Sequence, residues 1–181
     1  MPAAKNGEKE LSVLVILGID PGYAIVGWGV IDYRANTLRP VAFGAITTDA
    51  HTDFNSRLQK IYDETVELLG HAHPDAMAIE KLYFTTNVTT GIQVAQARGV
   101  ILLAAQQAGV PIYEYTPLQV KTAVTGYGKA HKPQVMEMTR RLLHLKEVPR
   151  PDDTADALAI AITHTQAAGT TLRDTMLKRG I

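Results

Sequence analysis

The fold is decided by residues 13–22, VLVILGIDPG, in which an apolar run ends in an acid followed by a Pro-Gly turn. A short apolar run bounded by turn residues predicts a buried strand, so Asp20 should lie at the mouth of that strand. The pattern returns in AMAIE (76–80), which ends in Glu80, and Asp153 and Asp156 open a strongly helical segment. We therefore expect four carboxylates to converge.

Converging carboxylates repel one another, by about 4 kcal/mol for two unit charges roughly 4 Å apart at an effective dielectric constant near 20. A divalent cation neutralises such a group. Ligands that are all oxygens select Mg²⁺ or Mn²⁺ rather than zinc. Two such ions activate a water and stabilise a leaving oxygen in phosphodiester hydrolysis.

Each acid also has a plainer interpretation. Asp20 before Pro-Gly could form only an Asx turn, and Glu80 could be a strand-end acid in solvent. Asp153 and Asp156 lie three apart and so project from one helix face. The neighbouring Asp152 could stand in for Asp153, although a helix start is its simpler role. Apolar residues around Asp156 make an unpaired charge there costly, which favours the cluster.

Length and composition indicate a globular protein. The chain has 181 residues, of which 46% are hydrophobic. We expect one domain over 13–167, with a flexible leader (1–12) and a flexible tail (168–181). The absence of cysteine excludes disulfides and thiolate metal sites, and it suits a cytoplasmic protein. No apolar run approaches the roughly 20 residues that cross a membrane, so we expect no membrane association.

The hydrophobic pattern predicts an α/β fold. Three strands near 13–20, 22–31 and 38–47 are joined by short turns, as in an antiparallel meander. The chain then alternates helices and strands: helix 54–69, the strand ending at Glu80, helix 91–107, strand 110–113, and helices from Thr116-Pro117 to about 167. This order predicts a five-stranded mixed sheet, first antiparallel and then parallel, with helices on both faces. Helix 91–107 is rich in small residues, which suits both a core and an interface.

Charge is unevenly distributed although the net charge is zero. Residues 49–80 hold seven acids and two bases, whereas residues 121–150 hold seven bases and two acids. The basic stretch could be a solvated helix face or a surface for nucleic acid. His71 and His73 lie at a helix end, where a cation is simply favoured. His164 lies in an apolar helix and suits a core or supporting role.

Six motifs occur in order along the chain: GIDPG (18–22), AIE (78–80), QARG (96–99), QVK (119–121), GYGKAHK (126–132) and DTADALAIAITH (153–164). In these the chain resembles the bacterial RuvC crossover-junction endonucleases, over about residues 13–167. The resemblance implies an RNase H-like fold and a homodimer that binds a four-way (Holliday) DNA junction. Such an enzyme nicks two opposed strands symmetrically, in recombination and repair.

The resemblance also implies roles for seven residues. Asp20, Glu80, Asp153 and Asp156 match the catalytic acids, which hold two Mg²⁺ ions per site with Mn²⁺ as a substitute. Lys121 and Lys132 match lysines near the scissile phosphates, and Tyr83 matches an aromatic residue that stacks on an unpaired base. Either lysine could instead be an ordinary surface residue, and Tyr83 could pack inward.

Two further expectations concern partners, and two alternative functions stay open. The resemblance implies that the helix near 96–105 forms the dimer interface and that a branch-migration motor complex of the RuvA–RuvB type acts with the protein. One alternative is an ATPase of the actin and sugar-kinase class, because GIDPG before a glycine-rich strand resembles their first phosphate loop. Another is a junction-binding module without catalysis, which would leave the acids unexplained.

Overall fold

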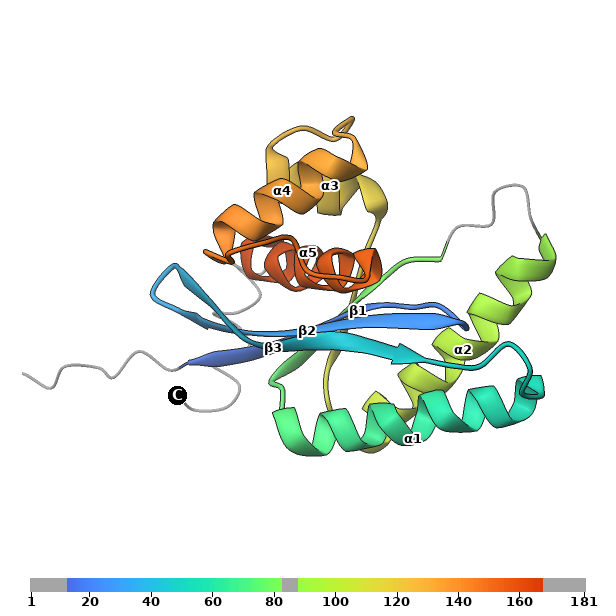
Figure 1. Cartoon of the computed structure of the whole chain (residues 1–181). Helices are drawn as coiled ribbons and strands as arrows, with labels where there is room; N and C mark the ends of the chain where they lie inside the picture. The colour runs from blue at the N-terminus through green and yellow to red at the C-terminus, as the bar shows by residue number, and fades with distance from the viewer. Residues whose placement is uncertain (1–12, 83–87, 168–181) are drawn as a thin grey trace, which may run out of the picture.

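A five-stranded sheet runs through the middle of the protein (Figure 1). The computed structural model describes residues 13–82 and 88–167. The strands are β1 (Leu14–Asp20), β2 (Ile25–Arg34), β3 (Thr37–Thr47), β4 (Ala76–Glu80) and β5 (Ile112–Tyr115), in the order β3-β2-β1-β4-β5. β1, β2 and β3 pair antiparallel, whereas β4 pairs parallel with both β1 and β5. The predicted mixed sheet is confirmed.

Helices cover both faces of this sheet (Figure 1). On one face lie α1 (Phe54–Ala72) and α2 (Val88–Gln107), and on the other lie α3 (Pro117–Thr125), α4 (Lys132–Leu142) and α5 (Asp152–Ala167). Thr116 caps α3 as predicted, since its side chain accepts a hydrogen bond from the backbone N–H of Gln119. The α/β class and the helices on both faces are confirmed.

Some element bounds differ from the prediction. β5 begins at Ile112 rather than at residue 110, because Pro111 contributes only its carbonyl, which accepts from the backbone N–H of Met77. β2 continues to Arg34, and the hairpin closes through Ala35 and Asn36, both at positive φ. α1 continues three residues further than predicted, to Ala72, and ends at the left-handed His73.

β1 is buried on both faces, which explains its continuous apolar sequence. Ile16 packs into the core beneath α5, together with Ile160 and Ile162. Leu17 and Ile19 point into a second core shared with α1 and α2. The end of β1 is therefore held from both sides, and so is Asp20, its last residue.

α5 approaches the sheet unusually closely, at glycines of β1 and β2. A Cβ atom on Gly18 would lie 2.0 Å from the carbonyl oxygen of Ala157, and one on Gly27 would lie 1.9 Å from that of Asp153. The hydroxyl of Thr154 also donates a 3.0 Å hydrogen bond to the carbonyl of Gly44. These contacts fix the first turn of α5 beside the end of β1, because Gly27 pairs with Asp20.

Some predictions fall on residues that the structure does not describe. Tyr83 lies outside the described residues, as do the expected leader and tail. Within residues 13–82 and 88–167, no helix combines the length and apolar character that a membrane span requires.

The close approach of α5 predicts a large cost for Gly18→Ala. The new methyl group meets backbone atoms of α5, so we expect a loss of about 3 kcal/mol or more in the free energy of unfolding, measured by denaturant titration. Gly70→Ala in α1 is the matched control, because a Cβ there meets nothing within 4 Å. The control should change stability by at most about 1 kcal/mol, and upward. Equal stability of the two variants would contradict this account of α5.

Candidate active site

The end of β1, the end of β4 and the start of α5 meet at one edge of the sheet. β1 and β4 are parallel neighbours with Ile19 opposite Ile79, so Asp20 and Glu80 follow at equivalent positions of adjacent strands. Carboxyl ends of parallel strands meet at the same edge of a sheet, where α/β proteins commonly bind ligands. α5 adds Asp153 and Asp156 from its first turns, directly over the sheet.

A cavity of about 270 Å³ lies at this edge. Its charged lining residues come from five elements or their ends: Asp20, Glu80, Lys121, Lys132 and Asp156. Apolar side chains form the rest of the lining, including Val120, Val135 and Ile160. The structure thus brings together five of the seven residues singled out in the sequence, from positions up to 136 residues apart.

The acids of this cavity perturb one another. Burial, followed by the charges of Asp156, Glu80 and Asp153, raises the pKa of Asp20 to about 8 against the opposing effect of Lys132. Burial and the charge of Asp156 also raise the pKa of Glu80. The pKa of Asp156 is raised as well, chiefly by burial. Protons bind here more readily than to ordinary carboxyls, as expected where negative charge lacks a full counter-charge.

Lys132 supplies part of that counter-charge. Its ammonium Nζ lies 2.8 Å from Oδ2 of Asp156 and 3.9 Å from Oδ2 of Asp152. The hydrogen bond with Asp156 raises the pKa of Lys132, so this side chain remains charged at neutral pH. Its half-exposed position leaves it accessible from solvent.

The buried carboxylates fit a hard cation such as Mg²⁺, which takes oxygen ligands. In this conformation no three Asp, Glu or His side chains of residues 13–82 and 88–167 form a group ready to hold a metal ion. The position of Lys132 gives a physical reason, because its ammonium already contacts Asp156. A cation bound to this same oxygen, Oδ2 of Asp156, would displace the Lys132 ammonium.

Asp152 and Asp153 differ in their surroundings. Asp152 pairs with Arg150, whose Nη1 lies 2.6 Å from its Oδ1. Asp153 does not line the cavity, but its charge raises the pKa of both Asp20 and Asp156. Asp152 raises the pKa of Asp156 and of Lys132 but is not among the charges that act on Asp20. These differences favour Asp153 as the acid that acts with Asp20.

The histidines do not contribute to this cavity. His71 makes a 2.9 Å hydrogen bond with the carbonyl of Glu67, and His73 caps α1. His164 is buried beside Tyr115 and shares a 2.7 Å hydrogen bond with its hydroxyl. The core role expected for His164 agrees with this position.

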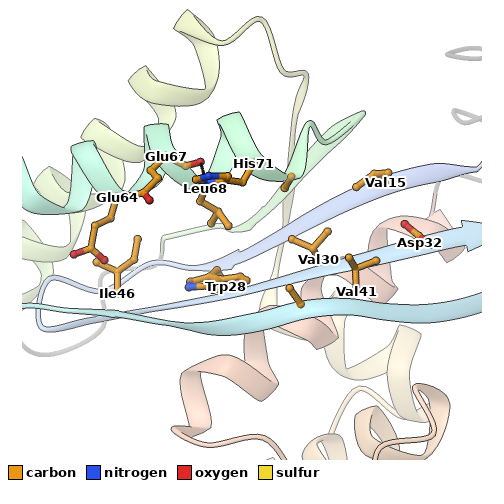
Figure 2. Close-up of a pocket in the computed structure, with 12 residues that line it drawn as sticks. Val15, Trp28, Val30, Asp32, Val41, Ile46, Glu64, Glu67, Leu68 and His71 are labelled. Carbon is orange, nitrogen blue, oxygen red and sulfur yellow. Dashed lines mark hydrogen bonds between the residues drawn. The ribbon is translucent and has the colours of Figure 1, made fainter.

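A larger cavity, of about 560 Å³, lies between α1 and the opposite face of the sheet (Figure 2). Trp28 and Val30 line it from the sheet, and Leu68, Glu64 and Glu67 line it from α1. Figure 2 shows Asp32 on β2, well apart from Glu64 along the cavity. Since these acids do not converge, this cavity lacks the carboxylate cluster of the smaller one.

Comparison with known proteins identifies the family. A family model described as crossover junction endodeoxyribonuclease RuvC matches residues 16–164. The chain belongs to the RuvC family. It is therefore a crossover junction endodeoxyribonuclease, and this membership decides against both the ATPase and the non-catalytic module.

RuvC relatives are close over most of the chain. The crossover junction endodeoxyribonuclease RuvC of Brevibacillus brevis is 61% identical over 151 residues, which are 83% of this chain and 91% of that protein. The structure of Thermus thermophilus RuvC in complex with a Holliday junction substrate has a TM-score of 0.83 at 39% identity, covering 87% of this chain and 96% of that one. The yeast mitochondrial Holliday junction resolvase Ydc2 shares the fold, with a TM-score of 0.62 at 14% identity, 92% of this chain and 86% of that one being covered. The expected RNase H-like fold is confirmed.

The burial of His164 predicts a pH-dependent difference in stability. Burial lowers the pKa of His164 from 6.5 to about 4, so between these values the unfolded chain binds the extra proton. The stabilisation is complete above about pH 6.5 and is lost as the pH falls toward 4, by about 3 kcal/mol in total at 1.36 kcal/mol per unit.

The measurement is the free energy of unfolding of the parent minus that of His164→Gln, at several pH values. The subtraction is needed because Asp20, whose pKa is raised, changes stability in the opposite direction over the same range. A difference that stays constant from pH 7 to 4 would contradict a buried, neutral His164.

Proposed function

We propose that Asp20, Glu80, Asp153 and Asp156 hold divalent cations with which this enzyme hydrolyses DNA phosphodiester bonds. The observation that carries the proposal is the gathering of Asp20, Glu80 and Asp156 around a single cavity, where burial and the charges of neighbouring carboxylates raise their pKa values. When bound, a pair of Mg²⁺ ions, or Mn²⁺ in their place, supplies an activated water and neutralises charge on the leaving 3′ oxygen. Family membership supports the use of divalent cations.

The two lysines of the cavity suit phosphate binding. Lys121 and Lys132 line the same cavity as the carboxylates, and a lysine ammonium is a compact point charge for phosphate oxygens. They belong to the basic stretch of residues 121–150, which lies on α3, α4 and their connections. This surface is our proposed path for the DNA backbone, with Tyr83 stacking on a base at the junction centre.

The proposed substrate is a four-way DNA junction, which is nicked symmetrically on two opposed strands. The Thermus thermophilus relative was solved with a Holliday junction substrate and matches 87% of this chain. Family membership also supports cytoplasmic action and cooperation with a branch-migration motor complex of the RuvA–RuvB type.

Paired nicks need two active sites, and we propose a homodimer formed through α2. Ile92 and Leu103 are 51% and 50% exposed, although both are large and apolar. They lie eleven positions apart, close to three full turns, and therefore share one helix face with Gly99 between them. An exposed apolar stripe with a small residue at its centre fits a second copy of the same helix.

Cleavage of a synthetic four-way junction tests the catalytic proposal. With Mg²⁺ or Mn²⁺ we expect paired nicks in the junction but not in linear duplex, and none in EDTA. Asp20→Asn and Asp156→Asn should lower the cleavage rate by about 100-fold or more, because an amide replaces an anionic ligand.

Asp32→Asn is the matched control, since Asp32 lies on the opposite face of the sheet and should leave cleavage unchanged. All variants should still bind the junction in gel-shift assays. Activity of Asp20→Asn at the parent rate would overturn the assigned site while leaving the family intact.

The dimer is tested by Leu103→Glu. A charge in the centre of an apolar interface should weaken dimerisation by tens-fold or more, measured by light scattering across a dilution series. Val66→Glu on α1 is the control, because Val66 is also exposed and apolar but lies on another helix. A parent protein that is monomeric at micromolar concentration would contradict the proposed interface.

A further inference from the structure

Arg98 is the member of the QARG motif that makes polar contacts at the end of β4. It projects from α2, and its Nε donates a 3.2 Å hydrogen bond to the backbone carbonyl of Glu80. Its Nη2 donates a 2.9 Å bond to Oε2 of Glu114 on β5. The Arg98 side chain is only 13% exposed and its bond to Glu80 is partly buried, whereas Glu114 is 45% exposed and its bond to Arg98 lies at the surface.

The bond to Glu80 lies next to the last backbone hydrogen bond between β4 and β5. The β4–β5 ladder closes with the backbone N–H of Lys81 donating to the carbonyl of Tyr115 at 2.8 Å. The guanidinium of Arg98 then binds the carbonyl of Glu80 and the side chain that precedes Tyr115. A planar guanidinium with several fixed donors can span these two acceptors, whereas a lysine ammonium has a single nitrogen.

Arg98 reaches Glu80 through the backbone and not through its carboxylate. The charges that act on the Glu80 carboxyl group come from Asp156, Lys132 and Lys121. The contact also joins two residues that are 18 positions apart in the chain. α2 is thereby tied to the end of β4, which carries the proposed cation ligand Glu80.

We propose that Arg98 is a positioning residue that fixes the end of β4, so that the Glu80 carboxylate is held at the cation site and cations bind tightly there. This inference rests on the proposed role of Glu80. Glu114 has the lesser part, because it orients the guanidinium but does not touch Glu80. Loss of a group that orients a metal ligand commonly lowers metal affinity by 10- to 100-fold.

The test compares Arg98→Ala, Arg98→Lys and Glu114→Gln in the full chain. Cation binding is measured directly, by the rise in melting temperature as Mn²⁺ is titrated without DNA. The half-saturating Mn²⁺ and Mg²⁺ concentrations are then measured for junction cleavage. We expect Arg98→Ala to raise these half-saturating concentrations about 10- to 100-fold. Arg98→Lys should restore only part of the lost cation affinity, and Glu114→Gln should raise the concentrations less than Arg98→Ala does.

Two further readouts separate positioning from general damage. At saturating Mn²⁺ the cleavage rate of Arg98→Ala should return to within about threefold of the parent, and junction affinity in EDTA should stay within twofold. Lys60→Ala is the matched control, because Lys60 on α1 also pairs with a glutamate but is 50% exposed and outside the cavity. It should shift neither cation titration.

A lower melting temperature with unchanged half-saturating concentrations in Arg98→Ala would overturn the proposal and leave a purely structural ion pair. If Arg98→Ala does not fold, the same comparison is made with Arg98→Lys, and a parent-like titration there overturns it. Glu80→Gln separates the two levels of inference. If Glu80→Gln binds cations as the parent does, the proposed cation site is wrong. If Glu80→Gln loses cation binding but Arg98→Ala keeps it, only the proposed role of Arg98 is wrong.

Discussion

The close contact between α5 and the sheet is the constraint on which the site depends. At Gly18 and Gly27 the carbonyls of Ala157 and Asp153 occupy the space of a Cβ atom. Any side chain at these glycines would push α5 away from β1 and β2, and with it the acids of its first turns. Backbone packing therefore sets the spacing between Asp20 on the sheet and the acids on the helix. Elements with no chemistry of their own determine whether the carboxylates can act together.

The carboxylate cluster is costly, and the two cores around the sheet compensate for it. Burial raises the pKa of Asp20, Glu80 and Asp156, so each would be more stable as an ion in water. Fully buried residues of β1 and β4 on both faces of the sheet, such as Ile16, Ile19 and Met77, supply the opposing stabilisation. Such local conflict within an otherwise consistent fold is typical of functional sites.

Much of this arrangement could be predicted from the sequence, because apolar runs ending in acids place Asp20 and Glu80 at strand ends. Parallel pairing of those strands then brings the two acids together without further information. Asp152 and Asp153 are adjacent in the chain, so the sequence leaves both open as the third acid of the site. Only their surroundings in the structure distinguish them, since Asp152 pairs with Arg150 whereas the charge of Asp153 acts on Asp20. The Arg98 contact with Glu80 could not be predicted, since it depends on where α2 lies over the sheet. The cavity beneath α1 likewise depends on how far that helix stands from β2.

Under the proposed roles of Lys132 and Asp156, their ion pair links cation binding and phosphate binding thermodynamically. One ammonium cannot stay against Asp156 and also contact a phosphate oxygen at full strength. A phosphate that draws Lys132 away leaves Asp156 with an uncompensated charge, which strengthens its attraction for a cation. By reciprocity a cation at Asp156 releases Lys132 and raises affinity for the phosphate by the same factor. With these roles, the empty and the fully loaded states are favoured over either half-loaded one, so that DNA strengthens a cation binding that also occurs without it.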